Sequence, residues 1–324
     1  MKSIDLKIAR SEAEWQKNRY VNAGVRECAG RLFLALERSL LKRIYCLVRN
    51  ICPAVKRERF RSSYDKDREN IVVSLTSTKD RIGTVFPTLV SLAAQTRKPD
   101  LIVLWLGENE VYPESVISKI KQMGVLIRYG EDLGPNTKYY HAFREYSNDV
   151  VITVDDDIIY HREMIEELYA AYLKYPDAVT ARRVHRIRFG RNRKPLRYVD
   201  WIWECRDCAG PAHDLMATGT GGVLYPPVVM ALKCWESKDF LKVCPKADDI
   251  WLKFSELNNG IRVCAVCGAR FHRDSVNLKA SKTTLAAVNV RKGRNDLYIK
   301  ACAGYFGMED DLCERILGAN YRLR

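Results

Sequence analysis

The chain has 324 residues, of which 47% are apolar and 29% charged, and its formal net charge is +14. This composition is typical of globular proteins and excludes the disordered, collagen-like and low-complexity classes. Apolar runs reach only six residues, whereas a spanning helix needs about 20, so we expect neither a transmembrane helix nor a signal peptide. The eleven cysteines are scattered and odd in number, which favours a reduced, cytoplasmic protein over a disulfide framework.

The N-terminal segment is basic, since residues 1–70 hold 17 Lys and Arg against 9 Asp and Glu. Within it, residues 31–49 follow the helical period, with an apolar stripe opposite a cluster of Arg and Lys. Such a helix can make a peripheral contact with the anionic inner face of the plasma membrane, or it can dock on the core with its charges in water. We therefore predict that residues 1–70 form a basic amphipathic helical segment and a linker.

From Ile71 onward the sequence alternates between apolar strands and helices. Strands are expected at 71–77, 101–107, 125–130 and 150–157, and helices at 84–96, 115–124, 137–147 and 161–176. The pattern then loosens, and a helix at 246–260, a strand at 261–267 and a helix near 308–317 follow. Such alternation predicts an α/β fold with helices on both faces of a mostly parallel sheet. The carboxyl ends of the strands then share one edge, where ligands bind.

Three consecutive acids, Asp155, Asp156 and Asp157, directly follow the strand VVITV. In an extended backbone the alternate carboxylates Asp155 and Asp157 lie on the same side and can approach one site. Neighbouring carboxylates repel one another unless a cation neutralises them, and Mg²⁺ or Mn²⁺ suits such oxygen ligands together with phosphate. The alternative is that the acids cap the next helix, although a single Asp would suffice for a cap.

Two further loops supply cations and hydroxyls to the same edge. Thr76, Ser77 and Arg81 follow the first strand, and their hydroxyls and positive charge suit a nucleotide or a diphosphate. Lys138 lies in the loop GPNTK at the start of a helix, where free backbone N–H groups favour an anion. An ordinary helix start would explain either loop alone. Together with the acid triplet, they indicate one anion-binding site.

The motifs SLTSTKDR, DLGPNTK, VDDDI, GTGGVLYPP and KADDIWL, in this order, resemble the sugar-nucleotide-dependent glycosyltransferases of the GT-A fold. The likeness extends from about Ile71 to Asp296 and is greatest to family-2-like enzymes that build bacterial cell-surface polysaccharides. It implies a Rossmann-like GT-A sheet, with a nucleotide-binding half at 71–160 and an acceptor-binding half at 161–324. It also implies a nucleotide-sugar donor whose diphosphate binds Mn²⁺ or Mg²⁺.

The resemblance also implies roles for single residues. Residues 76–81 match the nucleotide loop, and the acid triplet matches the family's DxD motif, with Asp155 near the ribose, Asp157 on the metal and Asp156 among the donor-binding residues. Of the pair Asp248 and Asp249, the second acid would face the acceptor hydroxyl and act as the general base, although either could cap its helix. A late His of the family often reaches the metal or the diphosphate, so His272 is a candidate ligand, whereas a lone His is more often structural.

The glycines of GTGGVLYPP (219–227) permit a close approach of the backbone. We expect Gly221 and Gly222 to press against the sugar ring, and the alternative is a tight turn at the edge of a domain. The Arg-rich stretch 182–197 suits a phosphorylated acceptor, but it could also bind nucleic acid or be a solvated loop.

Two Cys pairs, Cys205 with Cys208 and Cys264 with Cys267, have zinc-knuckle spacing within each pair. The pairs lie farther apart than in a zinc ribbon, so free or packed thiols are the favoured interpretation.

These observations predict a metal-dependent glycosyltransferase that moves a sugar from a nucleotide-diphosphate donor to a cell-surface glycan or lipid-linked acceptor. The alternative is a basic nucleic-acid-binding protein with a metal-dependent nuclease centre on the acid triplet. That alternative gives no purpose to KADDIWL or GTGGVLYPP, and base-stacking modules need more aromatic residues than 182–197 supplies. Nucleic acid is therefore not the expected partner.

Overall fold

The computed structural model describes residues 60–318 except 207, 209, 233–234, 267–275 and 278–292. The chain divides into two compact units, Met1–Arg57 and Glu58–Arg324, and the described residues all belong to the second. The predicted helix at 31–49 lies outside the described residues. In the described part of the chain, no helix has both the length and the apolar character needed to cross a membrane.

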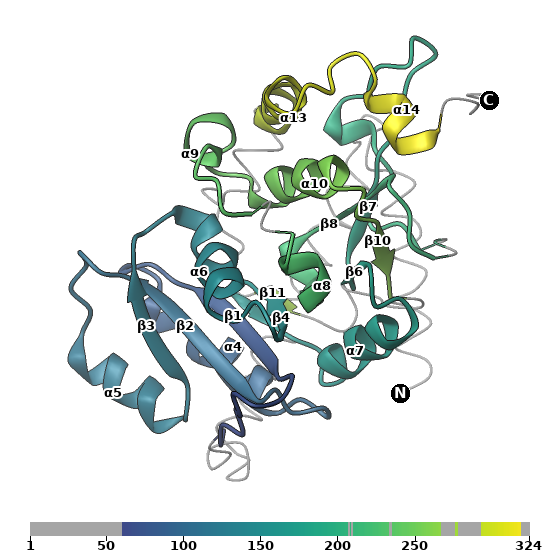
Figure 1. Ribbon diagram of the computed structural model, residues 1–324. Helices are drawn as coiled ribbons and strands as arrows, with labels where there is room; N and C mark the ends of the chain where they lie inside the picture. The colour runs from purple at the N-terminus through teal and green to yellow at the C-terminus, as the bar shows by residue number, and fades with distance from the viewer. Residues whose placement is uncertain are drawn as a thin grey trace, which may run out of the picture. The chain divides into compact units, whose positions relative to one another are not determined.

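A seven-stranded sheet with the order β10-β6-β9-β4-β1-β2-β3 forms the centre of this unit (Figure 1). Its strands are β1 (Ile71–Thr76), β2 (Leu101–Gly107), β3 (Leu126–Gly130), β4 (Val150–Thr153), β6 (Val179–Ala181), β9 (Val223–Tyr225) and β10 (Val263–Ala265). Only β9 runs against its neighbours, β4 and β6, whereas the other pairs in the sheet are parallel. This arrangement confirms the predicted α/β fold class with a mostly parallel sheet.

Helices cover both faces of the sheet. The described helices are α4 (Phe86–Ala93), α5 (Glu114–Gln122), α6 (Thr137–Glu145), α7 (Met164–Lys174), α8 (Pro227–Met230), α9 (Phe240–Val243), α10 (Asp248–Asn258), α13 (Arg294–Tyr305) and α14 (Leu312–Leu317). The alternation of side chains along β1 shows the two layers, because Val72 packs in a core cluster with α6 and α10, whereas Val73 packs in another with α4, α5 and α7. Burial on both faces explains why β1, β2 and β4 are almost wholly apolar.

Several elements are shorter than the sequence predicts, and two of the differences fall beside the acid triplet. The strand expected at 150–157 ends at Thr153, because the three acids leave the ladder and β5 (Ile158–Ile159) then pairs with β11 (Val276–Asn277). The helix expected at 161–176 begins at Met164. A second small sheet pairs β7 (Val184–Arg186) with β8 (Leu215–Ala217) and occupies the region where the sequence pattern loosens.

Candidate active site

The acid triplet and the loop after β1 meet at one edge of the sheet. Strands β1 and β4 are parallel neighbours, so the segments that follow them leave the sheet side by side. Ser77 donates its hydroxyl proton to Asp156 Oδ2 over 2.6 Å. The Arg81 guanidinium pairs with Asp156 and, over 2.8 Å, with Asp157 Oδ2. The two loops that the sequence assigns to a nucleotide therefore lie in contact through a cation and a hydroxyl.

Lys138 joins the acid triplet to α10. It lies in the first turn of α6, where its carbonyl oxygen accepts a 2.5 Å hydrogen bond from the hydroxyl of Ser74 on β1. Its Nζ lies 2.7 Å from Asp155 Oδ1 and 3.0 Å from Asp248 Oδ2, and its side chain is only 6% exposed. The structure thus brings Asp155 and Asp248, which are far apart in the sequence, to opposite sides of one buried ammonium group.

Gly219 lies directly against this group of charged side chains. Its backbone N–H donates to Asp249 Oδ1 over 2.9 Å. A Cβ atom at this position would lie 2.9 Å from Lys138 Nζ and 3.4 Å from the carboxylate oxygens of Asp155 and Asp249. The sequence predicts a close approach of the backbone at the glycines of GTGG, of which Gly219 is the first, but it does not predict which side chains Gly219 contacts. Its importance depends on three other loops that only the fold brings together.

The next two glycines, Gly221 and Gly222, lie against neighbouring parts of the protein itself. A Cβ atom at Gly221 would lie 2.7 Å from that of Arg183, and one at Gly222 would lie 3.0 Å from Met164 Sδ. Gly222 also has a φ of +85°, which favours glycine. These contacts explain the residue type by local packing, and the role of either glycine toward a sugar stays a prediction.

The site holds more acids than bases among its described residues. Five carboxyl groups, from Asp155, Asp156, Asp157, Asp248 and Asp249, surround two cations, Lys138 and Arg81. Burial lowers the pKa of Lys138, but Asp155 and the α10 acids outweigh this effect and raise it well above its usual range. Burial raises the pKa of Asp155, but Lys138 outweighs burial and lowers it. This ammonium–carboxylate pair is therefore charged at neutral pH.

The pKa values of Asp156, Asp248 and Asp249 are raised, whereas that of Asp155 is lowered. Burial raises the pKa of Asp156 to about 6 against the opposing charge of Arg81. Burial likewise raises the pKa of Asp248, although Lys138 opposes it. Burial, followed by repulsion from Asp248, raises the pKa of Asp249 to about 8. Burial and, after it, the neighbouring carboxylates thus oppose the ionisation of these acids, and a cation bound among them would favour their charged forms.

Two other predicted site residues, Thr76 and His272, are not part of this group of contacts among the described residues. Thr76 donates its hydroxyl proton to the carbonyl oxygen of Trp105 over 3.0 Å, so this side chain links β1 to β2. His272 lies outside the described residues. The strand β11 begins four residues later and pairs with β5, which directly follows Asp157.

Comparisons with known proteins complete this description. Residues 75–221 match the model of the family Glycosyl transferase family 2, and the match contains the β1 loop, Lys138 and the acid triplet. Residues 75–221 are therefore similar to family 2 glycosyltransferases over somewhat less than half of the chain. The pair Asp248 and Asp249 lies beyond the matched residues.

A structural comparison finds the crystal structure of TarS from S. aureus, with a TM-score of 0.43 and 12% sequence identity. The similarity covers 61% of this chain and 35% of that one, so the chain spans about a third of the length of the TarS chain. A comparison with curated proteins finds no match.

Proposed function

We propose that this protein is a glycosyltransferase, that it uses a divalent cation to bind a nucleoside-diphosphate sugar, and that it transfers the sugar to a cell-surface glycan or lipid-linked acceptor. The observation that carries the proposal is the convergence of five carboxyl groups on two cations at the edge of the sheet. A diphosphate adds further negative charge to this place. An additional cation would offset this charge.

The side chains at this edge fit Mn²⁺ or Mg²⁺. Carboxylate oxygens are the ligands that these hard cations prefer, and five carboxyl groups meet here around two side-chain cations. Asp155 and Asp157 would hold the cation, with His272 as a further candidate ligand. The cation would neutralise the diphosphate as it leaves the sugar.

The donor-binding residues surround this position. Arg81 spans Asp156 and Asp157, and a guanidinium there can turn to the oxygens of a phosphate. Lys138 keeps Asp155 ionised and oriented. The proposed donor-binding set is Thr76, Ser77, Arg81, Lys138, Asp155, Asp156, Gly221 and Gly222.

We assign the general base to Asp249 and a supporting role to Asp248. Asp248 is buried, and its Oδ2 lies 3.0 Å from Lys138 Nζ. Its carboxylate is therefore already paired with an ammonium group and is less suited to accept a proton from the acceptor. Asp249 is partly exposed. The N–H of Gly219 donates a hydrogen bond to Oδ1 of this residue, not to Oδ2. Asp249 takes the proton of the acceptor hydroxyl while that oxygen attacks C1 of the sugar. The bond from C1 to the diphosphate oxygen breaks in the same displacement.

The experiment that tests this proposal is a screen of nucleotide sugars for hydrolysis in the presence of Mn²⁺ or Mg²⁺. One nucleotide sugar should release its nucleoside diphosphate in the presence of either cation. In EDTA no nucleotide sugar should be hydrolysed. Retention and cleavage of DNA or RNA are measured beside it. Cleavage of nucleic acid without hydrolysis of any nucleotide sugar would favour the nuclease alternative and contradict the proposal.

The basic N-terminal segment suggests where the enzyme acts. We propose that it is cytoplasmic and that residues 31–49 make a peripheral contact with an anionic membrane, where a lipid-linked acceptor would be found. The charge balance of residues 1–70, 17 bases against 9 acids, supports this proposal.

A further inference from the structure

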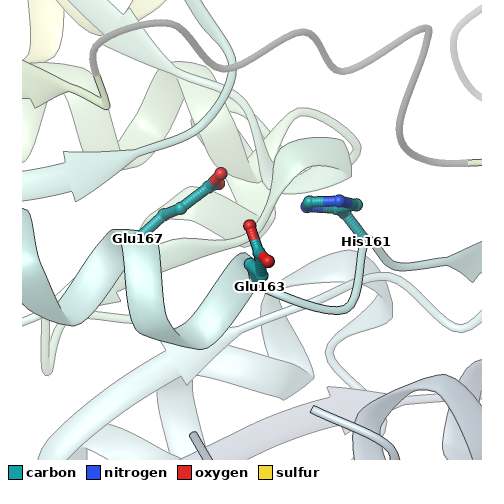
Figure 2. A group of neighbouring side chains, drawn as sticks. All are labelled: His161, Glu163 and Glu167. Atoms are coloured by element: carbon teal, nitrogen blue, oxygen red, sulfur yellow. The ribbon is translucent and has the colours of Figure 1, made fainter. Parts of the chain in front are cut away.

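A second group of potential metal ligands lies beside the acid triplet in the chain and outside the proposed donor site. His161, Glu163 and Glu167 each offer one ligand atom, and these atoms lie within 4.8 Å of one another. Figure 2 shows the imidazole and the two carboxylates turned toward one another. Within the described ranges no other group of three His, Cys, Asp or Glu side chains meets this distance.

Hydrogen bonds fix the backbone around this group. His161 follows β5, and its carbonyl oxygen accepts hydrogen bonds from Gln95 Nε2 over 2.8 Å and from the N–H of Met164 over 3.1 Å. Glu163 is the N-cap residue of α7, and the N–H of Glu167 donates to its carbonyl oxygen over 2.9 Å. The two carboxylates therefore lie one helical turn apart on the same face. Like charges at this spacing destabilise a helix unless a cation lies between them.

The imidazole supplies an independent indication of a ligand. His161 Nδ1 is buried and has no hydrogen-bond partner among the described residues. An unsatisfied buried polar atom costs about 1–3 kcal/mol, and a cation would remove this cost by accepting the nitrogen lone pair.

An outer contact orients one of the carboxylates. Arg182 Nε donates to Glu167 Oε2 over 2.5 Å, and the Arg182 side chain is fully buried. Hydrogen bonds of this kind commonly hold metal-ligating carboxylates in place. The N–H of Arg182 in turn donates to the carbonyl oxygen of Gly222 over 3.4 Å, so the group is linked to the glycine turn next to the donor site.

We propose that His161, Glu163 and Glu167 bind a second divalent cation, of the zinc class, that is distinct from the cation of the donor diphosphate. One imidazole and two carboxylates form a mixed nitrogen and oxygen set, which suits Zn²⁺ better than Mg²⁺, and three protein ligands leave one position for water. The cation clamps the loop after β5 to the first turns of α7. It thereby fixes residues 158–163, which connect the acid triplet to α7.

The test is equilibrium dialysis of the full chain, stripped of metal with a chelator, against Zn²⁺ under reducing conditions. The starting protein is Asp157→Asn, which weakens the proposed donor site. In this background Glu163→Gln and His161→Ala should each lose one tight equivalent of Zn²⁺, with at least about a tenfold drop in affinity, because changes in outer contacts alone cost about 10- to 100-fold. Glu163 is exposed, so its substitution should leave the fold intact.

A matched control lies on the same helix. Glu166 pairs with Arg97 Nε over 3.2 Å and is not part of the group, so Glu166→Gln should bind Zn²⁺ as the starting protein does. Zn²⁺ held by cysteines would be unaffected by Glu163→Gln. Equal Zn²⁺ binding by Glu163→Gln and Glu166→Gln would overturn the proposal, as would the absence of a tight equivalent in Asp157→Asn. Neither result depends on whether a nucleotide sugar binds, so the proposed function is tested separately.

Discussion

Replacing Asp249 by Asn tests the chemical role of the acid pair on α10. Asn keeps the size of the side chain and an Oδ1 atom that can accept the 2.9 Å hydrogen bond from Gly219. The fold and the donor affinity should therefore be nearly unchanged. The lost function is proton acceptance, which typically contributes about 10²- to 10⁴-fold in rate, equivalent to about 3–5 kcal/mol in the barrier. We expect kcat to fall by this factor.

The assay compares kcat, nucleotide Kd and the pH profile of kcat/KM for the wild type, Asp249→Asn and Asp248→Asn. Because the pKa of Asp249 is raised to about 8, kcat/KM of the wild type should rise with pH up to about that value. Asp249→Asn should lack this limb. Asp248→Asn removes the partner of Lys138 and should mainly weaken donor binding. A normal kcat in Asp249→Asn would refute the assignment of the base, and a large loss of nucleotide affinity would place the residue on the donor instead.

Three further predictions address charge. Lys138→Met leaves buried carboxylates without their partner and should cost about 3–5 kcal/mol, which lowers Tm by roughly 10 °C. Lys121→Met, on the exposed side of α5, is the control, and an equal Tm for both variants would contradict the assignment. The folded protein holds the proton of Asp249 more tightly than the unfolded chain does. The free energy of unfolding of the metal-free protein should therefore fall as the pH rises from about 4 to about 8, and Mn²⁺ should raise Tm more at the upper end of this range. A Tm shift independent of pH would count against a cation among these acids. Reversing Arg38 and Lys42 to Glu should weaken binding to anionic vesicles, by about 1 kcal/mol per removed base, and less at high salt. Unchanged binding would favour the docked helix.

The fold follows from the sequence where local patterns decide it. The uninterrupted apolar runs of β1 and β2 predict strands buried on both faces, and both are found at 71–76 and 101–107. The reversed strand β9 has only three residues. A run that short carries no period from which its direction could be read, because direction depends on the neighbouring strands β4 and β6.

The candidate site shows the same division. Asp155 and its two neighbours stand out because an acid triplet after an apolar strand is unusual in itself. The contact between Lys138 and Asp248 joins residues from α6 and α10, and no spacing in the sequence predicts it. The sequence indicates a close backbone approach at Gly219 but not its neighbours, because those are side chains on three other elements.

The central claim is that a divalent cation holds a nucleoside diphosphate at the acid triplet. Isothermal titration of nucleoside diphosphates into the wild type and Asp157→Asn, with and without Mn²⁺, tests it most directly. The Asp157 side chain is only 17% exposed but lies at the edge of the sheet and contacts Arg81, so the variant should keep its fold. We predict that the wild type binds the cognate diphosphate tightly only with Mn²⁺, and that Asp157→Asn loses this dependence together with most of the affinity. Equal binding by both proteins in EDTA would contradict the account.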